Sequence, residues 1–393
     1  MDELTLQQRD QTYVANTYTR FPVALVSGSG VHCKDIDGKG YIDLTAGIGV
    51  NSLGFCDPVW GAAVAKQAMT LQHTSNLYYT SPCVDVAETL CRRTGAKKVF
   101  FANSGAEANE GLIKTARKYS RKKYGDGRDH IVTLINSFHG RTVTTLAATG
   151  QEHFHHDFHP FTEGFCYAKA NDVQDTIAAL SDHRVCAILM EMVQGEGGVI
   201  ALDADYVQEI VKYCKAYDIL VLVDEVQTGI GRTGSLLAYE QFGIAPDAVS
   251  CAKGLAGGLP IGGVLFFDKT ENVLCAGDHA TTFGGNPICC AGAKVVLDRL
   301  SDAFLEQVRN KSVLFYERLK KMPHVTAVSG LGLMIGVTFE DGIAAKDVVT
   351  KAIEAGLLTL TAKTKLRLLP PLVISEEEIT QAMDLLEQVL TNI

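Results

Sequence analysis

A lysine and an aspartate at the ends of two predicted strands are the residues best placed to do chemistry. Lys253 follows the apolar run 248–252 and precedes a glycine-rich turn, while Asp224 ends the apolar run 219–223. Lys253 comes 29 positions after Asp224, which leaves room for one crossover to a neighbouring strand. A lysine leaving a strand is either a solvated cation or, when desolvated, a nucleophile that forms a Schiff base with a carbonyl group. The nearby carboxylate favours the Schiff-base lysine.

A possible anion site lies upstream. The segment 103–110 follows another predicted strand and opens a helix. Such a turn offers free backbone N–H groups and a positive helix end to an anion, with Ser104 as a further donor; an ordinary helix cap is the alternative. The segment lacks both the glycine spacing of a dinucleotide site and the lysine of a nucleoside-triphosphate loop. One phosphate group is therefore the expected ligand.

These features together match the needs of pyridoxal phosphate. That cofactor requires a lysine for its aldehyde, a carboxylate for its ring nitrogen and an anion site for its phosphate. Lys253, Asp224 and the segment 103–110 supply all three. A metal site is the alternative, but no His or Cys spacing near Asp224 supports one, and the histidines within 153–159 are irregularly spaced. We therefore expect no metal.

The sequence pattern around these residues predicts an α/β fold. Uninterrupted apolar strands that alternate with helices predict a largely parallel sheet covered on both faces. The predicted strands are 98–102, 131–135, 185–190, 219–223, 248–252 and 263–267.

The two ends of the chain read differently. Residues 31–44 resemble a β-hairpin with Asp37-Gly38 at its turn, in a separate peripheral unit. After about Pro287 the pattern changes to helices with strand-like runs at 333–337 and 366–369, and it closes with a helix after the capping box Ser375-x-x-Glu378. This part predicts a smaller α+β domain.

An ordered series of motifs adds a resemblance over nearly the whole length. The motifs are Asn16-Thr17-Tyr18, Arg20-Phe21-Pro22-Val23, Gly47-Ile48-Gly49-Val50-Asn51-Ser52-Leu53-Gly54, Thr74-Ser75-Asn76-Leu77-Tyr78, Phe138-His139-Gly140-Arg141-Thr142, Asp224-Glu225-Val226-Gln227-Thr228-Gly229 and Thr281-Thr282-Phe283-Gly284-Gly285-Asn286-Pro287. In these the chain resembles the class III pyridoxal-phosphate aminotransferases, and among them the group that acts on acetylornithine. One departure is Gly54-Phe55-Cys56-Asp57-Pro58, which stands where the family usually has glycine-histidine-x-histidine-proline.

The resemblance implies the transferase fold type I of pyridoxal-phosphate enzymes. This fold has a large domain with a mostly parallel seven-stranded sheet and a smaller α+β domain. We expect residues 1–45 to form an N-terminal segment that is part of the small domain, 46–285 the large cofactor domain and 286–393 the C-terminal small domain.

The resemblance also implies cofactor roles. Lys253 would be the catalytic residue, bonded to the cofactor and then free to shuttle a proton to and from the substrate carbon. Asp224 would hold the ring nitrogen, Val226 and Phe138 would pack on the two ring faces, and Gln227 would face the phenolic oxygen. The expected cofactor-binding residues are Ser104, Gly105, Ala106, Phe138, Asp224, Glu225, Val226, Gln227, Lys253 and Thr282, the last reaching the phosphate of the partner subunit in a homodimer.

Four further residues match substrate contacts of the family. Arg141 would grip a substrate carboxylate with its guanidinium fork, and Arg367 would bind the α-carboxylate of glutamate. Glu196 would mask Arg367 when the basic substrate binds. Thr281 stands where the family usually has a serine that contacts acetylornithine.

The composition of the chain limits which kinds of binding partner and which compartment are expected. The chain has 393 residues and a net charge of −9, with no basic run beyond residues 121–123, which argues against a nucleic-acid partner. Its eleven cysteines show no C-x-x-C spacing, and a reducing cytoplasm fits them best. Residues 1–10 lack the apolar core of a signal peptide, and no apolar run reaches membrane length.

The expected activity is reversible transfer of the terminal amino group of N2-acetyl-L-ornithine to 2-oxoglutarate, giving N-acetyl-L-glutamate 5-semialdehyde and L-glutamate in arginine biosynthesis. Ornithine, succinylornithine and 4-aminobutyrate are alternative amino donors. A non-catalytic protein that keeps the fold for binding is an alternative of another class, although Lys253, Asp224 and Gln227 are all intact.

Overall fold

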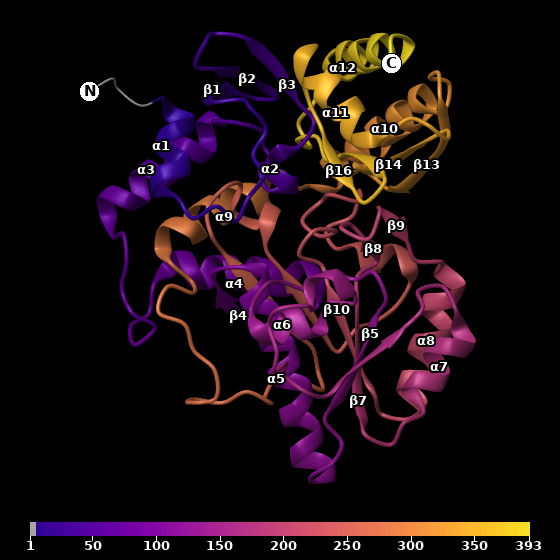
Figure 1. Cartoon of the computed structure of the whole chain (residues 1–393). Helices are drawn as coiled ribbons and strands as arrows, with labels where there is room; N and C mark the ends of the chain where they lie inside the picture. Colours follow the sequence, from indigo (N-terminus) through magenta and orange to yellow (C-terminus); the bar gives the residue numbers. More distant parts are fainter. Residues whose placement is uncertain (1–4) are drawn as a thin grey trace.

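A seven-stranded sheet forms the centre of the computed structural model, which describes residues 5–393 (Figure 1). Its spatial order is β4, β12, β11, β10, β7, β5, β6, and six strands run in one direction while β12, between β4 and β11, runs in the other. The strands are β4 (Lys98–Ala102), β5 (His130–Leu134), β6 (Phe165–Ala168), β7 (Val185–Met190), β10 (Leu220–Asp224), β11 (Ala248–Cys251) and β12 (Gly262–Phe266). The predicted mostly parallel seven-stranded sheet is confirmed.

Both faces of this sheet are buried. Successive side chains of a strand point to opposite faces, and in β10 Leu220 and Leu222 belong to one hydrophobic cluster while Val221 and Val223 belong to another. This double burial explains why the strand reads as an unbroken apolar run. Strand β6 was not predicted: it is a four-residue strand at the sheet edge whose side chains are mostly only partly buried.

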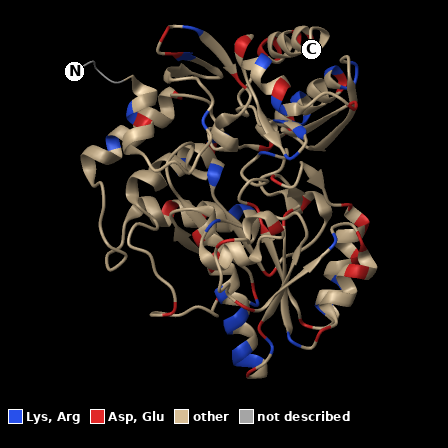
Figure 2. Ribbon diagram, viewed as in Figure 1, with Lys and Arg blue, Asp and Glu red and all other residues tan. Residues whose placement is uncertain are grey.

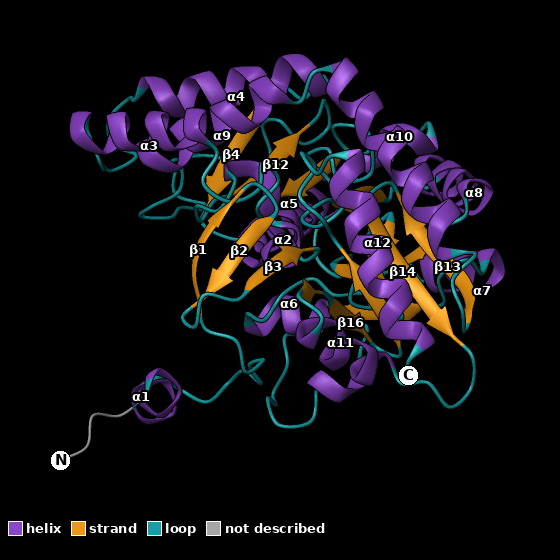
Figure 3. Ribbon diagram, turned by 90° about the horizontal axis from the view of Figure 1, so that it is seen from above, coloured by secondary structure: helices purple, strands orange, loops and turns teal. Residues whose placement is uncertain are grey.

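Helices flank the sheet, and α3, α4 and α9 pack together on one side of the molecule (Figure 3). The helices of the first three quarters of the chain are α1 (Leu6–Tyr13), α2 (Ala46–Gly49), α3 (Pro58–Thr70), α4 (Ser81–Thr94), α5 (Gly105–Tyr124), α6 (Val143–Ala148), α7 (Val173–Leu180), α8 (Ala204–Ala216) and α9 (Pro287–Arg299), with short 3-10 turns at η1 (Glu152–Phe154), η2 (Ala238–Phe242) and η3 (Lys253–Ala256).

The C-terminal part builds a second sheet, of order β13, β14, β17, β16. Its elements are α10 (Asp302–Leu319), β13 (Val325–Leu331), β14 (Met334–Phe339), α11 (Ala345–Glu354), β16 (Leu360–Ala362), β17 (Lys365–Leu368) and α12 (Glu376–Thr391). The capping box predicted before the last helix is present, since Ser375 Oγ accepts from the Glu378 N–H and the Glu378 carboxylate accepts from the Ser375 N–H.

The two ends of the chain meet in a third sheet. The predicted hairpin is formed by β2 (His32–Asp35) and β3 (Gly40–Asp43), next to β1 (Leu25–Ser29). Strand β3 also pairs in parallel with β15 (Leu357–Leu358) from the C-terminal part, so the hairpin is not the separate unit that the sequence indicated. The pairing lies between residues too far apart for a local pattern to show it. Residues 1–4 of the expected N-terminal segment lie outside the described residues.

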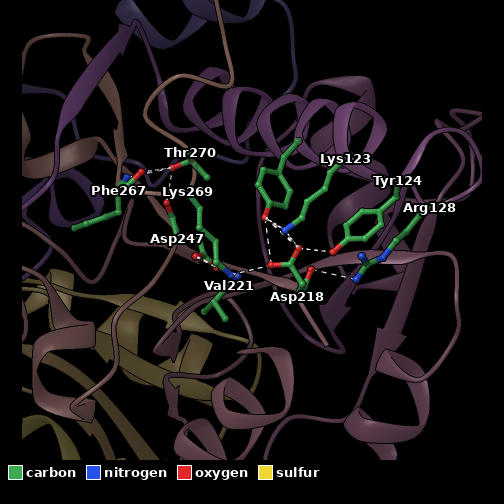
Figure 4. A network of polar contacts seen from close by, with 10 residues as sticks. Lys123, Tyr124, Arg128, Asp218, Val221, Asp247, Phe267, Lys269 and Thr270 are labelled. Carbon is green, nitrogen blue, oxygen red and sulfur yellow. Dashed lines mark hydrogen bonds and ion pairs between the residues drawn. The ribbon is translucent and has the colours of Figure 1, made fainter. Parts of the chain in front are cut away.

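Helix α5 is fixed to the sheet at its C-terminal end. Asp218, just before β10, accepts hydrogen bonds from Lys123 at 2.8 Å, Tyr124 at 2.5 Å and Lys269 at 3.1 Å (Figure 4). Burial raises the pKa of Asp218, but the hydrogen bonds from these partners outweigh burial and the pKa lies below its ordinary value. The bonds from Lys123 and Tyr124 join the last turn of α5 to the start of the central strand. Lys and Arg residues gather on this end of the helix (Figure 2).

No helix within residues 5–393 is long and apolar enough to cross a membrane.

Candidate active site

Polar side chains converge where the parallel strands end, which is the usual position of ligand sites in open α/β sheets. Asp224 is the last residue of β10, Glu191 follows β7, and Lys253 comes two residues after β11. These strands are neighbours or nearly so in the sheet. The arrangement explains how residues distant in sequence come to share one site.

Asp224 is buried and surrounded by donors. Its Oδ2 accepts from Asn109 Nδ2 at 2.7 Å and lies 2.8 Å from His139 Nδ1, and its Oδ1 accepts from the Val226 N–H at 2.9 Å. Ser250 Oγ donates to Asn109 Oδ1 at 2.7 Å and so orients the amide. These contacts hold the Asp224 carboxylate in one orientation, in which it can accept from a further cationic N–H group.

The start of α5 has free amides and is closely packed by two loops. Ser104 caps the helix by accepting from the Glu107 N–H at 3.2 Å. The N–H groups of Gly105 and Ala106, at the first two positions of the helix, have no carbonyl partner within it. A Cβ atom on Gly105 would lie 2.5 Å from Val226 Cγ1, and one on Gly140 would lie 2.8 Å from Ala106 Cβ. The glycines therefore let the loops after β5 and β10 close on the helix N-terminus.

Lys253 lies in a strained and desolvated position. Its φ is 38°, a left-handed conformation that is unusual for a side-chain-bearing residue. Burial lowers the pKa of its ammonium, against the opposing charges of Glu196 and Asp224. A lowered pKa favours the neutral amine that a nucleophilic lysine needs.

A second charged group faces the same space. Arg367, buried on β17, donates to Glu196 Oε1 at 2.5 Å. Burial raises the pKa of Glu196, but the charge of Arg367 and its hydrogen bond outweigh burial, and the net shift is downward. Gln227 contacts both partners at 3.4 Å. The predicted pair of Glu196 and Arg367 is thus formed beside Lys253.

Arg141 is exposed and lies over two aromatic rings. Its guanidinium carbon is 4.2 Å from the ring centroid of Phe154 and 5.5 Å from that of Phe138. The two rings meet edge to face at 5.9 Å. This platform holds the guanidinium at the site while leaving its N–H groups free to bind a carboxylate.

Sequence reasoning missed several residues of this site. Glu191 accepts from the Phe138 N–H at 3.0 Å, and burial, with the charge of Asp224, raises the pKa of the Glu191 carboxyl well above its ordinary value. Asn109 and His139 lie inside motifs that were recognised, but their contacts to Asp224 cross from one element to another. Ser250 offered one signal: it is a polar residue within a fully buried strand.

Three predicted residues do not join this cluster. Glu225 is fully buried and its carboxylate accepts from Thr228 and from the Tyr239 N–H, so it faces the protein interior and not Asp224. Thr281 accepts from Asn103 Nδ2 at 2.8 Å near the start of α5. Thr282 is exposed. The described part of the chain contains no group of three or more His, Cys, Asp or Glu side chains arranged to hold a metal ion.

Comparisons with known proteins show the family of the chain. The profile of the aminotransferase class-III family matches residues 13–390. An acetylornithine aminotransferase of Haemophilus ducreyi is 53% identical over 386 residues, which cover 98% of each chain.

Solved structures are similar over the same length. The N-acetylornithine aminotransferase of Stenotrophomonas maltophilia superposes with a TM-score of 0.86 at 33% identity, covering 98% of this chain and 99% of the other. An ornithine aminotransferase of Toxoplasma gondii, which holds PLP at partial occupancy in its active site, superposes with a TM-score of 0.94 at 32% identity, covering 99% and 95%.

The fold and the site thus define a transferase of amino groups, and the chain belongs to the aminotransferase class-III family. Its cofactor is pyridoxal 5′-phosphate, and the residues present fit that group. The gap between Val226 and the helix start admits no Cβ on Gly105, a lysine with a lowered pKa stands nearby, and Asp224 keeps a carboxylate oxygen available.

Proposed function

We propose that this protein transfers the terminal amino group of N2-acetyl-L-ornithine to 2-oxoglutarate, giving N-acetyl-L-glutamate 5-semialdehyde and L-glutamate, a step of arginine biosynthesis. The observation that carries the choice of donor is the 53% identity, over 98% of both chains, with an acetylornithine aminotransferase. Relatives with 40–47% identity that bear the same name support it.

Pyridoxal phosphate supplies an aldehyde that bonds to an amine and a protonated ring that takes up electrons when a C–H bond breaks. In this proposal Asp224 keeps the ring nitrogen protonated, and Val226 and Phe138 hold the ring between them. Ser104, Gly105 and Ala106 bind the phosphate at the start of α5. Lys253 provides the amine that anchors the cofactor and then carries the proton to and from the substrate carbon.

Arg367 binds a carboxylate of one substrate but not of the other. Acetylornithine has one carboxylate, which Arg141 binds, and Glu196 neutralises Arg367 through their 2.5 Å contact. 2-Oxoglutarate has two carboxylates, and the second one takes the place of Glu196 on Arg367. One site therefore serves both half-reactions. Thr281 contributes a hydroxyl near the acyl end of the donor.

A panel of amino donors tests this proposal. Initial rates with acetylornithine, succinylornithine, ornithine and 4-aminobutyrate are measured at a fixed 2-oxoglutarate concentration, with Lys253→Ala as the inactive control. We expect the highest kcat/KM for acetylornithine. A higher kcat/KM for free ornithine would assign the chain to that donor instead, in line with the ornithine aminotransferases among its structural neighbours.

We also propose that the protein works as a homodimer. Asn76 Nδ2 donates to the Gly284 carbonyl at 2.9 Å, which brings residues 76–79 beside the loop that carries Thr282. The apolar side chains of these two segments are exposed, and the relative exposure reaches 87% for Leu77 and 102% for Tyr79. A second subunit on this surface would bury them and bring Thr282 to its cofactor phosphate.

The cytoplasm is the compartment that we propose. All eleven cysteines are free, including fully buried ones such as Cys214 and Cys251. Reduced thiols persist where glutathione and thioredoxin keep the environment reducing. Small-molecule substrates of amino-acid metabolism are expected there.

A further inference from the structure

The loop that carries Glu196 contains a strained residue, Val199, that packs on the C-terminal sheet. This loop, residues 195–199, joins the paired strands β8 (Val193–Gln194) and β9 (Ile200–Ala201). Val199 has a φ of 52° and is fully buried. A β-branched residue is a rare occupant of this left-handed region, because its side chain crowds the backbone. Tertiary contacts must hold it there.

The contacts come from the sheet that carries Arg367. Strand β9 lies against β13 (Figure 1). A Cβ atom on Gly336 would lie 2.8 Å from Val199 Cβ, and one on Gly330 would lie 3.0 Å from Val199 Cγ1. The missing side chains of these two glycines therefore form the recess that the Val199 isopropyl group fills.

Gly336 links this recess to the substrate site. It pairs directly with Arg367 across β14 and β17. The other end of the loop is equally confined, since a Cβ on Gly195 would lie 2.4 Å from Gln227 Oε1. Glu196 is held between these two close approaches, at 2.5 Å from Arg367 Nη1.

We propose that Val199 is a positioning residue that sets how firmly Glu196 masks Arg367, and thereby the preference of the site between dicarboxylates and acylated amines. The inference rests on the proposed function, in which Glu196 and a substrate carboxylate compete for Arg367. The isopropyl group in its recess keeps the loop in a backbone conformation that it would otherwise leave. Loss of this contact moves Glu196 away from Arg367, so that a dicarboxylate meets less competition.

Glutarate is the probe, because it has two carboxylates and no amino or keto group that reacts. Its Kd for the pyridoxal-phosphate holoenzyme is measured by titration calorimetry. In Val199→Ala we expect glutarate to bind about 5- to 10-fold more tightly, at the low end of the usual range of coupling between two contacts. We also expect kcat/KM for glutamate to rise relative to kcat/KM for acetylornithine in this variant.

A second variant distinguishes the effect of backbone strain at residue 199 from the effect of lost side-chain packing. Val199→Gly loses more of the side chain but adopts positive φ without cost. If strain drives the loop away, Val199→Gly changes the Kd for glutarate less than Val199→Ala does. Gly336→Ala pushes on the same contact from the opposite strand and is expected to tighten glutarate binding as well. Val313→Ala, at an exposed position of α10, is the matched control and leaves the Kd unchanged.

Glu196→Gln separates this inference from the proposed function. Tighter glutarate binding in Glu196→Gln combined with an unchanged Kd in Val199→Ala and Gly336→Ala would overturn the role of Val199 alone. An unchanged Kd in Glu196→Gln would overturn the masking role on which both rest. In Val199→Ala, an equal fall in kcat/KM for both half-reactions with no change in the Kd for glutarate would make Val199 a purely structural residue. That result would contradict the proposal.

Discussion

The Asp224 carboxylate has one acceptor position that no protein donor occupies closely. Oδ2 interacts with Asn109 and His139, and Oδ1 accepts from the Val226 N–H. The Ser250 hydroxyl lies 3.5 Å from Oδ1 and bonds more closely to Asn109 at 2.7 Å. Each carboxylate oxygen has two lone pairs, so Oδ1 can accept one more strong hydrogen bond. The protein thus orients the carboxylate, and in the proposed function the remaining bond goes to the ring nitrogen of the cofactor.

The fit at Gly105 leads to a prediction about cofactor affinity. In Gly105→Ala the new methyl group would overlap Val226, which lies 2.5 Å from the ideal Cβ position. Because overpacking of this kind costs about 1–3 kcal/mol, we expect the Kd for pyridoxal phosphate to rise about tenfold or more. Absorbance titration of the apoprotein measures it. Gly61→Ala in α3, where a Cβ meets no atom within 4 Å, is the control, and an equal Kd in the two variants would contradict the fit.

Glu225 predicts a pH dependence of stability. Burial raises the pKa of Glu225 to about 7, above its ordinary value of 4.5. The folded state therefore holds this proton more tightly than the unfolded state does. The corresponding stability is fully present below pH 4.5 and is lost as the pH rises through about 7, a change of about 3 kcal/mol.

Glu225→Gln removes this titration while keeping the size of the side chain. We expect its free energy of unfolding, measured by urea denaturation, to fall less between pH 5 and pH 8 than that of the unmodified protein. Glu306→Gln, at an exposed position of α10, should keep the original slope. Parallel curves for Glu225→Gln and the unmodified protein would contradict the assignment.

At the scale of elements, α5 is joined to β10 at both ends of the strand. Asn109, in the second turn of the helix, bonds to Asp224 at the strand end, and Asp218 before the strand start binds Lys123 and Tyr124 of the last turn (Figure 4). A helix held at two points cannot slide along the sheet. The distance between the anion site at its start and the carboxylate of Asp224 is therefore fixed by the fold.

Asp218→Asn tests the far attachment. The amide keeps the shape but loses the charge that Lys123 and Lys269 bind, and we expect a loss of about 1–3 kcal/mol in the free energy of unfolding. Because the pKa of Asp218 lies below its ordinary value, the stabilisation is present at neutral pH and is lost as the pH falls below about 3.8. Asp298→Asn removes an exposed pair with Lys294 and should cost less than about 0.5 kcal/mol. A similar loss of unfolding free energy in Asp218→Asn and Asp298→Asn would show that the Asp218 network stabilises the fold no more than an exposed ion pair does.

The same elements show what the sequence can predict. The strands around β10 were found because burial on both faces makes a continuous apolar run, and the closing helix was found through its capping box. The pairing of β3 with β15 was not found, since it joins residues more than three hundred positions apart. His139 and Glu191 were missed for a related reason: their roles depend on side chains that meet only in the folded chain.

At the scale of the whole molecule, the proposed homodimer would place Thr282 in the site of the other subunit. The residue is exposed, and it lies between Thr281, which is bonded to Asn103, and Phe283, which is 59% exposed. An exposed hydroxyl beside exposed apolar side chains is well placed to enter a second copy of the chain. In a two-fold symmetric dimer each subunit would then complete the site of the other.

Subunit mixing tests this sharing. Lys253→Ala and Thr282→Ala chains are each expected to show little turnover at limiting pyridoxal phosphate, the second because its phosphate loses a charge-assisted hydrogen bond. In a mixed dimer with shared sites, one site carries both changes and the other carries neither. Random exchange in equal amounts should therefore restore about a quarter of the activity of the unmodified protein, since about half of the dimers are mixed and each has one intact site. If Thr282 served its own chain instead, every site would carry one change, and mixing would restore nothing.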